Sequence, residues 1–130
     1  MKKNLLLIVL LLMSLISSTS CSKDEDPDKD TTVTFIYSMD NVENVIVDAI
    51  IFEYNSKDEV VGSLSVKNCK KGTSKIFSAK PTTEKIKVQL NIGIGILEKG
   101  YWVQEVYYIN TGQDNHIEIS GSTITGSKEP

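Results

Sequence analysis

The sequence predicts an all-β domain, a single two-sheet antiparallel sandwich of about seven strands, over residues 32–125. Apolar residues recur at every second position in several short runs, the period at which strand side chains share one face. Asn, Asp and Gly residues that favour turns separate these runs at short, regular intervals. No segment within residues 32–125 shows helical periodicity of useful length. Together these observations favour a sandwich over a mixed fold.

The first half of the domain reads as four strands. Residues 33–39 alternate apolar and polar side chains, and residues 45–52 are apolar except Asp48, which predicts a central strand covered on both faces. An unpaired buried carboxylate is costly, so Asp48 is expected to have a partner or to face solvent. Residues 60–66 follow a turn, and a short strand over 76–79 is closed by Pro81.

The second half contains the clearest run. Residues 86–96 place six branched apolar side chains at strict period two, and Glu98-Lys99-Gly100 is expected to form the turn that ends this strand. Residues 101–109 then form an aromatic-rich strand. After a turn, Ile117 and Ile119 begin the last strand, which residues 123–125 extend.

The 130 residues divide into four regions. Residues 1–20 begin with a positive charge, followed by an apolar run too short to span a bilayer, as in a helical signal peptide. Residues 21–31 form a disordered acidic tether, because a stretch with so many carboxylates cannot bury apolar area. The domain spans residues 32–125, and a disordered tail over 126–130 completes the chain.

Small residues precede Cys21, and Ser18 occupies the position at which Leu is usual. This segment resembles a bacterial lipobox, which implies lipidation of Cys21 and a membrane anchor through the lipid. Ordinary signal cleavage after Ser20 is the alternative, because Ser18 and Ser20 also satisfy the small-x-small rule.

The residues after Cys21 resemble the export signal of Bacteroidota-type surface lipoproteins; the matching residues are Lys23, Asp24, Glu25 and Asp26. The resemblance implies a small lipoprotein on the outer membrane that faces the cell exterior. The number and spacing of the expected strands separately favour an immunoglobulin-like or transthyretin-like layout for the sandwich. A plain linker, with the domain facing the periplasm, is the alternative. Asp30-Thr31-Thr32 resembles an O-glycosylation acceptor of the same group, which would place a glycan on Thr31; a polar linker end is the alternative.

Composition excludes several functions. Loss of Lys2 and Lys3 with the leader takes the formal net charge from −3 to −5, and every basic residue is Lys, so nucleic acid is not an expected partner. One His and two Cys do not make a His/Cys metal site, and no cofactor is implied.

Catalytic motifs are weak as well. A catalytic His works on a nucleophile, and no Ser of this sequence lies in the Gly-x-Ser-x-Gly motif that would pair with His116. Glu98 and Glu105 are charged residues of the kind that hairpins ordinarily carry. Cys69 is expected to be a half-buried residue at the end of a strand. A disulfide between Cys69 and Cys21 requires that Cys21 escape lipidation. We therefore expect no enzymatic activity; a hydrolase or a hydrolase inhibitor is the remote alternative.

The candidate ligand contacts lie in the aromatic strand. Alternation places Tyr101 with Val103 on one side and Trp102 with Tyr108 on the other, and exposed aromatic rings suit sugars or proteins. The leading hypothesis is a non-catalytic binding or envelope-assembly module whose protein or glycan ligand is unknown. The alternative is a glycan-capture lipoprotein that uses Tyr101, Trp102 and Tyr108.

Overall fold

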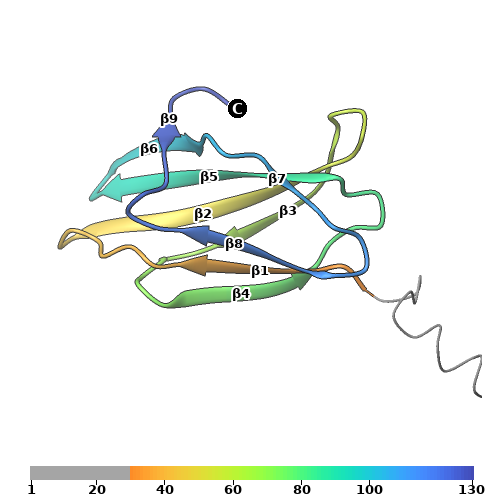
Figure 1. Ribbon diagram of the computed structural model, residues 1–130. Helices are drawn as coiled ribbons and strands as arrows, with labels where there is room; N and C mark the ends of the chain where they lie inside the picture. Colours follow the sequence, from red (N-terminus) through yellow and green to blue (C-terminus); the bar gives the residue numbers. More distant parts are fainter. Residues whose placement is uncertain (1–29) are drawn as a thin grey trace, which may run out of the picture.

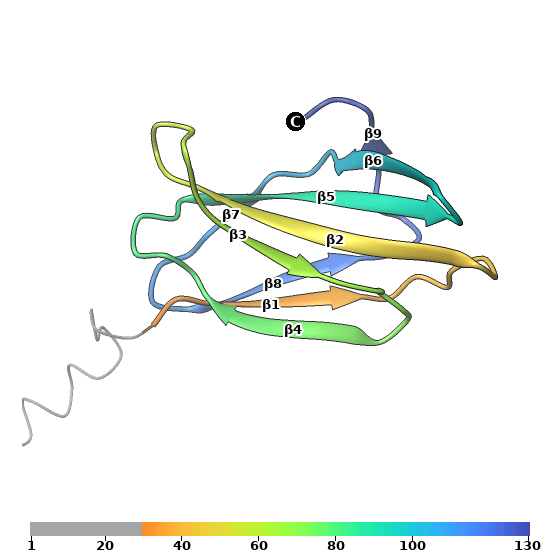
Figure 2. The same ribbon diagram turned by 180° about the vertical axis from the view of Figure 1, so that it is seen from behind.

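The computed structural model describes residues 30–130. The signal peptide and most of the tether, with Cys21, Lys23, Asp24, Glu25 and Asp26, lie outside the described residues. Nine strands and no helix occupy residues 30–130, as Figures 1 and 2 show from opposite sides. The strands are β1 (Thr32–Tyr37), β2 (Val45–Tyr54), β3 (Val60–Val66), β4 (Thr73–Ser78), β5 (Lys85–Ile94), β6 (Leu97–Val103), β7 (Tyr107–Tyr108), β8 (Asp114–Ile119) and β9 (Thr125–Gly126).

The strands form two sheets that face each other. The smaller sheet has the order β4-β1-β8, and the larger has the order β3-β2-β5-β6-β9, with β7 paired to β5. The predicted all-β, two-sheet fold is confirmed, with nine strands instead of about seven because β7 and β9 are two-residue strands. One pairing departs from the antiparallel expectation: β1 and β8 run parallel, because the intervening chain crosses to the larger sheet before it returns.

The core lies between the sheets and is built from the alternation seen in the sequence. In β1, Val33, Phe35 and Tyr37 point inward and are fully buried. The facing strands contribute Val47, Ala49, Ile51, Ile86, Val88, Leu90, Val103, Ile117 and Ile119. A single apolar layer of this kind is what two packed sheets bury on folding.

The prediction that β2 is covered on both faces is wrong. Val47, Ala49 and Ile51 are buried, whereas Ile46 on the other face is 55% exposed. A two-layer sandwich covers only the inner face of each sheet, so a continuous apolar run still leaves one face partly open. Asp48 lies on this open face, where its carboxylate accepts the Asn68 amide proton at 2.7 Å and pairs with Lys67 at 3.5 Å.

The predicted turn at residues 98–100 is also wrong, because the chain turns earlier, at Gly95 and Ile96. Ile94 pairs with Leu97 across this two-residue turn, and Gly95 has a φ of 61°. A positive φ at the first central position is the requirement of a type II′ hairpin, which glycine meets without strain. Gly100 instead lies inside β6, and β4 begins at Thr73, three residues before the expected strand.

The aromatic segment is divided into β6 and β7, which pair with different parts of β5. Trp102 pairs with Gln89, and Tyr107 pairs with Ile86, so the intervening segment carries two residues more than a regular ladder would. An even number of extra residues preserves the alternation of faces. Val103 and Tyr107 therefore share a face, as their spacing predicts, and the structure shows that this face is the one that packs on the core.

The start of β1 and the β5–β6 hairpin lie at opposite ends of the sandwich. The chain enters at the start of β1, and Figure 1 shows the β5–β6 hairpin and the β1–β2 loop together at the far end. The entry is held in place by backbone bonds from Thr32 to the Gln113 carbonyl and from Ala79 to the Thr31 carbonyl.

Candidate functional site

A group of exposed apolar side chains lies at the end of the sandwich opposite the start of β1. Nine large hydrophobic side chains are exposed among the described residues, and five of them belong to this end: Val42, Ile46, Ile94, Ile96 and Leu97. We call these five residues the apolar tip. Monomeric soluble domains seldom gather exposed aliphatic side chains in this way, and such patches mark interaction sites.

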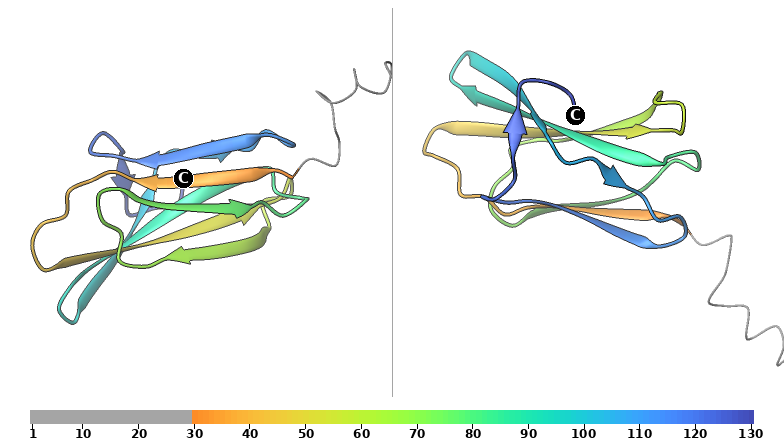
Figure 3. Two further views of the ribbon diagram at one scale, coloured as in Figure 1. Left: turned by 90° about the horizontal axis from the view of Figure 1, so that it is seen from below. Right: turned by 45° about the horizontal axis from the view of Figure 1, so that its top comes forward.

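The tip exists because the hairpin extends past the smaller sheet. Along the inner face of β5 the exposed fraction rises from 1% at Leu90 to 59% at Ile94, and Ile96 in the turn is fully exposed at 100%. Figure 3 shows the β5–β6 hairpin projecting beyond the strands of the opposite layer. The same period-two pattern that fills the core thus continues into solvent.

A hollow of about 340 Å³ opens on this hairpin. Its apolar wall consists of Ile92, Ile94, Leu97 and Tyr101, and its charged rim consists of Glu98 and Lys99. The Lys99 ammonium lies 5.2 Å from the centre of the Tyr101 ring, within the range of a cation–π contact. The hollow offers apolar contact and one charge of each sign.

The three aromatic residues predicted to contact a ligand do not form one platform. Tyr101 faces inward and lines the hollow, whereas Trp102 is on the outer face, where its ring packs 5.5 Å from that of Phe52. Tyr108 pairs with Lys85 at the other end of β5 and is 71% exposed. Only Tyr108 therefore presents a largely free ring.

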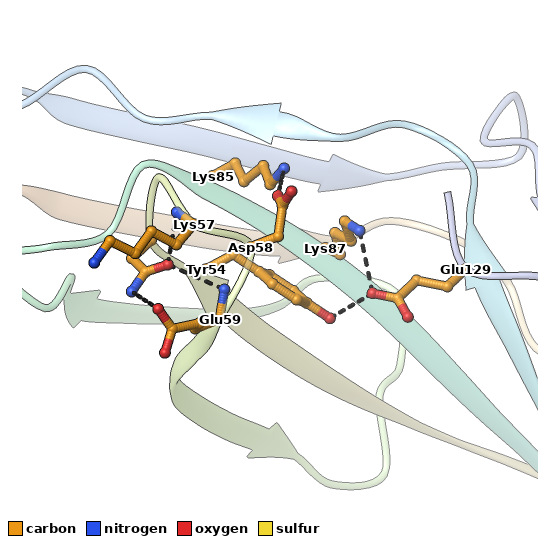
Figure 4. A network of polar contacts seen from close by, with 8 residues as sticks. Tyr54, Lys57, Asp58, Glu59, Lys85, Lys87 and Glu129 are labelled. Atoms are coloured by element: carbon orange, nitrogen blue, oxygen red, sulfur yellow. Dashed lines mark hydrogen bonds and ion pairs between the residues drawn. The ribbon is translucent and has the colours of Figure 1, made fainter.

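The end of the chain lies over the outer face of the larger sheet, as Figure 4 shows. One Glu129 carboxylate oxygen accepts the Tyr54 hydroxyl proton at 2.6 Å and lies 3.1 Å from the Lys87 ammonium. The pKa of the Glu129 carboxyl is held below its usual range, first by the hydrogen bond from Tyr54 and then by the hydrogen bond and positive charge of Lys87. The side-chain amide of Gln104 donates to the Lys128 carbonyl at 2.9 Å. Residues 126–130, for which the sequence predicted disorder, thus have defined partners.

The residues weighed for catalysis are only partly brought together. Glu105 and His116 line one polar hollow with Asp114, but this hollow has no Ser, Thr or Cys among its lining residues, and Glu98 lies at the tip instead. The Tyr107 hydroxyl on this hollow is buried, and burial, with the charge and hydrogen bonding of the nearby Glu105, raises its pKa to about 12. The arrangement lacks the nucleophile that a hydrolytic triad requires.

Cys69 is a core residue. It is fully buried, its thiol donates to the Val66 carbonyl at 3.3 Å, and burial raises its thiol pKa. A raised pKa makes the thiolate scarce at neutral pH, so the neighbouring lysines do not activate this thiol.

Thr31 lies where the tether meets the domain. Its side-chain oxygen accepts the Gly112 amide proton at 2.8 Å, and the residue is half-buried. The expected glycan acceptor is thus already part of the contact that holds the β1 entry.

Within residues 30–130, no group of three or more His, Cys, Asp or Glu side chains is placed to hold a metal ion. The same part of the chain contains no helix long and apolar enough to cross a membrane. Comparison with protein-family models, with curated proteins and with solved structures finds no match. The class that the fold and the site define is therefore an all-β sandwich with an exposed apolar hairpin at one end.

Sequence reasoning did not single out the apolar tip. The signal was available in Ile94, Ile96 and Leu97, which surround Gly95. A turn built from aliphatic side chains departs from the polar residues that turns ordinarily carry. The run of residues 86–96 reads as one half-buried strand or as a strand bent at its glycines, and neither interpretation predicts a hairpin turn at Gly95.

Proposed function

We propose that this protein is a lipid-anchored, non-catalytic binding module of the outer membrane, exposed on the cell surface, which contacts another protein through its apolar tip. The observation that supports the proposal is the position of the tip, at the end of the sandwich farthest from the tether. An anchor at one end and an apolar patch at the other suit a module that presents a contact away from its membrane.

Simple dimensions support this orientation. The nine residues that follow Cys21 as far as Asp30 reach at most about 32 Å when extended. The ten-residue strands β2 and β5 each span about 33 Å. With the tether extended, the tip could therefore lie up to about two domain lengths from the membrane that holds the lipid.

The chemistry of the tip favours binding over catalysis. Aliphatic side chains dominate it, and its charged rim consists of the exposed Glu98 and Lys99. A catalytic acid, base or nucleophile works from a site that excludes water and holds a third group in place. An open hairpin provides contact area without those features.

Glycan capture is the second candidate, and Tyr108 is the observation in its favour. Its exposed ring borders the polar hollow, where Glu105, Asp114 and His116 offer hydrogen-bonding groups for sugar hydroxyls. Isothermal titration of the domain with a panel of glycans tests this candidate, because Trp102 does not line the hollow and its fluorescence would not report binding there. Binding that is lost in Tyr108→Ala would support glycan capture, and absence of heat with every glycan of the panel would exclude it.

Protease treatment of intact cells tests the proposed function. We expect the domain of the native chain to be cleaved, and the variant Asp24→Ala, Glu25→Ala, Asp26→Ala to be protected. A matched variant, Asp28→Ala with Asp30→Ala, removes acids outside the predicted signal and should be cleaved like the native chain. Protection of the native chain would place the domain in the periplasm and overturn the surface assignment.

A further inference from the structure

We infer that the tip recognises an extended segment of a different protein, which adds to the larger sheet as an antiparallel strand along β6 and places an acidic side chain opposite Lys99. This inference rests on the proposed function, because it names the chemistry of the partner at the same tip. The open edge of β6, its charge pattern and the adjoining hollow carry it together.

The free edge of β6 is the first observation. On one side β6 pairs with β5 from Leu97 to Trp102, and on the other β9 pairs only with Trp102 and Val103. After Gly126 the chain leaves the edge, and Glu129 lies over Tyr54 and Lys87 instead. Residues 97–101 thus present a row of backbone groups with no strand beside them in the described structure. An exposed edge of this length is a template for strand addition.

The side chains of this edge define what an incoming strand must carry. Leu97, Lys99 and Tyr101 share the inner face, because they pair with Ile94, Ile92 and Leu90. Directly opposed residues share a face, and opposite charges stabilise such pairs whereas like charges destabilise them. The complementary strand therefore has an acidic residue opposite Lys99, a basic residue opposite Glu98 and an apolar residue opposite Leu97.

The hollow accommodates the apolar residues of such a strand. Leu97 lies on the open-edge strand β6, Ile94 lies across from it on β5, and both are more than half exposed. An apolar side chain on the inner face of an added strand would lie against Leu97, with Ile94 one strand further in. Backbone pairing would thus supply the attachment, and the wall and rim of the hollow would supply the selectivity.

A second copy of this chain is a poor occupant. In an antiparallel pair of identical strands, directly opposed residues lie on the same face of the sheet. The two-fold axis between the strands therefore passes midway between one residue and the same residue of the second copy. The register that pairs all of residues 97–101 is centred on Lys99, which places two lysines opposite each other. A charge on the inward face of an edge strand is a known protection against self-pairing. Lys99 therefore disfavours the homodimer and favours a partner with an acid at that position.

Peptide binding to the purified full-length lipoprotein in detergent tests the inference. The probe is a fluorescein-labelled ten-residue peptide with the central sequence Val-Tyr-Glu-Lys-Ile, which opposes Tyr101 through Leu97 in order. The control peptide exchanges the central charges and reads Val-Tyr-Lys-Glu-Ile. We expect the first peptide to bind about tenfold more tightly, because two cross-strand ion pairs replace two like-charge contacts.

A charge exchange in the protein provides the decisive control. In the double variant Glu98→Lys, Lys99→Glu, the preference between the two peptides should invert, and this inversion also shows that the variant is folded. Lys75→Glu, a charge change on the edge strand β4, should leave the preference unchanged.

Three outcomes would overturn the inference. The native protein could bind the two peptides equally or bind neither of them, or the variant Glu98→Lys, Lys99→Glu could prefer the same peptide as the native protein. These measurements use purified protein, so they do not depend on where the domain resides. Protection from protease on intact cells would instead contradict the proposed function and leave the peptide result standing.

Discussion

The two ends of the sandwich differ in what their side chains contact: polar groups are hydrogen-bonded at one end, and apolar groups are exposed at the other. At the tether end the chain is tied down by polar contacts: Asn115 bonds to the backbone of Thr32, Asn110 and Gln113, and Glu53 accepts protons from the Lys80 amide and the Thr83 hydroxyl. At the tip, aliphatic side chains extend into solvent with no facing layer. One end is closed by satisfied hydrogen bonds, and the other keeps apolar area free. The contacts that stabilise this domain therefore lie at one end of the sandwich and in its core, and the surface that we propose for binding lies at the other end.

A matched pair of leucines measures this difference most directly. Leu90→Ala removes a fully buried side chain from β5 and should lower the free energy of unfolding by about 3 kcal/mol. Leu97→Ala, at a position that is 73% exposed, should change it by less than about 0.5 kcal/mol. Chemical denaturation followed by Trp102 fluorescence measures both. Similar losses in the two variants would show that the tip is part of the core.

Removal of the Asn115 side chain tests the tether end. Asn115→Ala deletes four polar contacts, three of which share the two protons of the side-chain amide, with lengths between 2.8 and 3.2 Å, and leaves partly buried backbone groups without these partners. We expect a loss of about 2–3 kcal/mol in the free energy of unfolding. Gln113→Ala, an exposed neighbour, is the control and should be close to neutral. An Asn115→Ala variant with an unchanged free energy of unfolding would show that these polar contacts do not stabilise this end of the sandwich.

The C-terminal contact on the outer face should respond to pH. The pKa of Glu129 is lowered by its hydrogen bonds to Tyr54 and Lys87, so its contribution is fully present above the unfolded-state pKa of about 4.3. That contribution is lost as pH falls through the lower folded-state pKa. Because Glu129 is partly exposed, the effect is at most about 1 kcal/mol.

The variant Glu129→Gln isolates this effect. The difference in free energy of unfolding between the native chain and the variant should be largest near neutral pH and should shrink at acidic pH. Urea denaturation at a series of pH values measures it. A difference that grows as pH falls would contradict the assigned ion pair.

The smallest expected effect on stability belongs to the turn of the tip. Ile96→Ser replaces a side chain that makes no buried contact, so the free energy of unfolding should change by less than about 0.5 kcal/mol. At the neighbouring Leu97, which lines the hollow on β6, the same substitution should also reduce binding of the strand peptide. A clear loss of stability with intact binding would reverse the roles assigned to the two ends.

Part of the fold was predictable because alternation reports burial directly. Val33, Phe35 and Tyr37 are buried as their spacing predicts, and Val103 and Tyr107 share the inner face as expected. The predictions at Gly95 and at β2 failed for a common reason. The alternation of apolar and polar residues shows which side chains of a strand share a face. It does not show which faces, or how much of each strand, the facing sheet covers.

The sequence by itself predicted the all-β class and which side chains of a strand share a face, and its first thirty residues resemble those of an exported lipoprotein. These properties follow from local spacing and composition. Only the tertiary structure decided that the β5–β6 hairpin extends past the smaller sheet, that β6 keeps a free edge and that Glu129 lies on Tyr54 and Lys87. Each of these depends on which segments distant in the chain become neighbours, and neither the period nor the composition of a single strand carries that information.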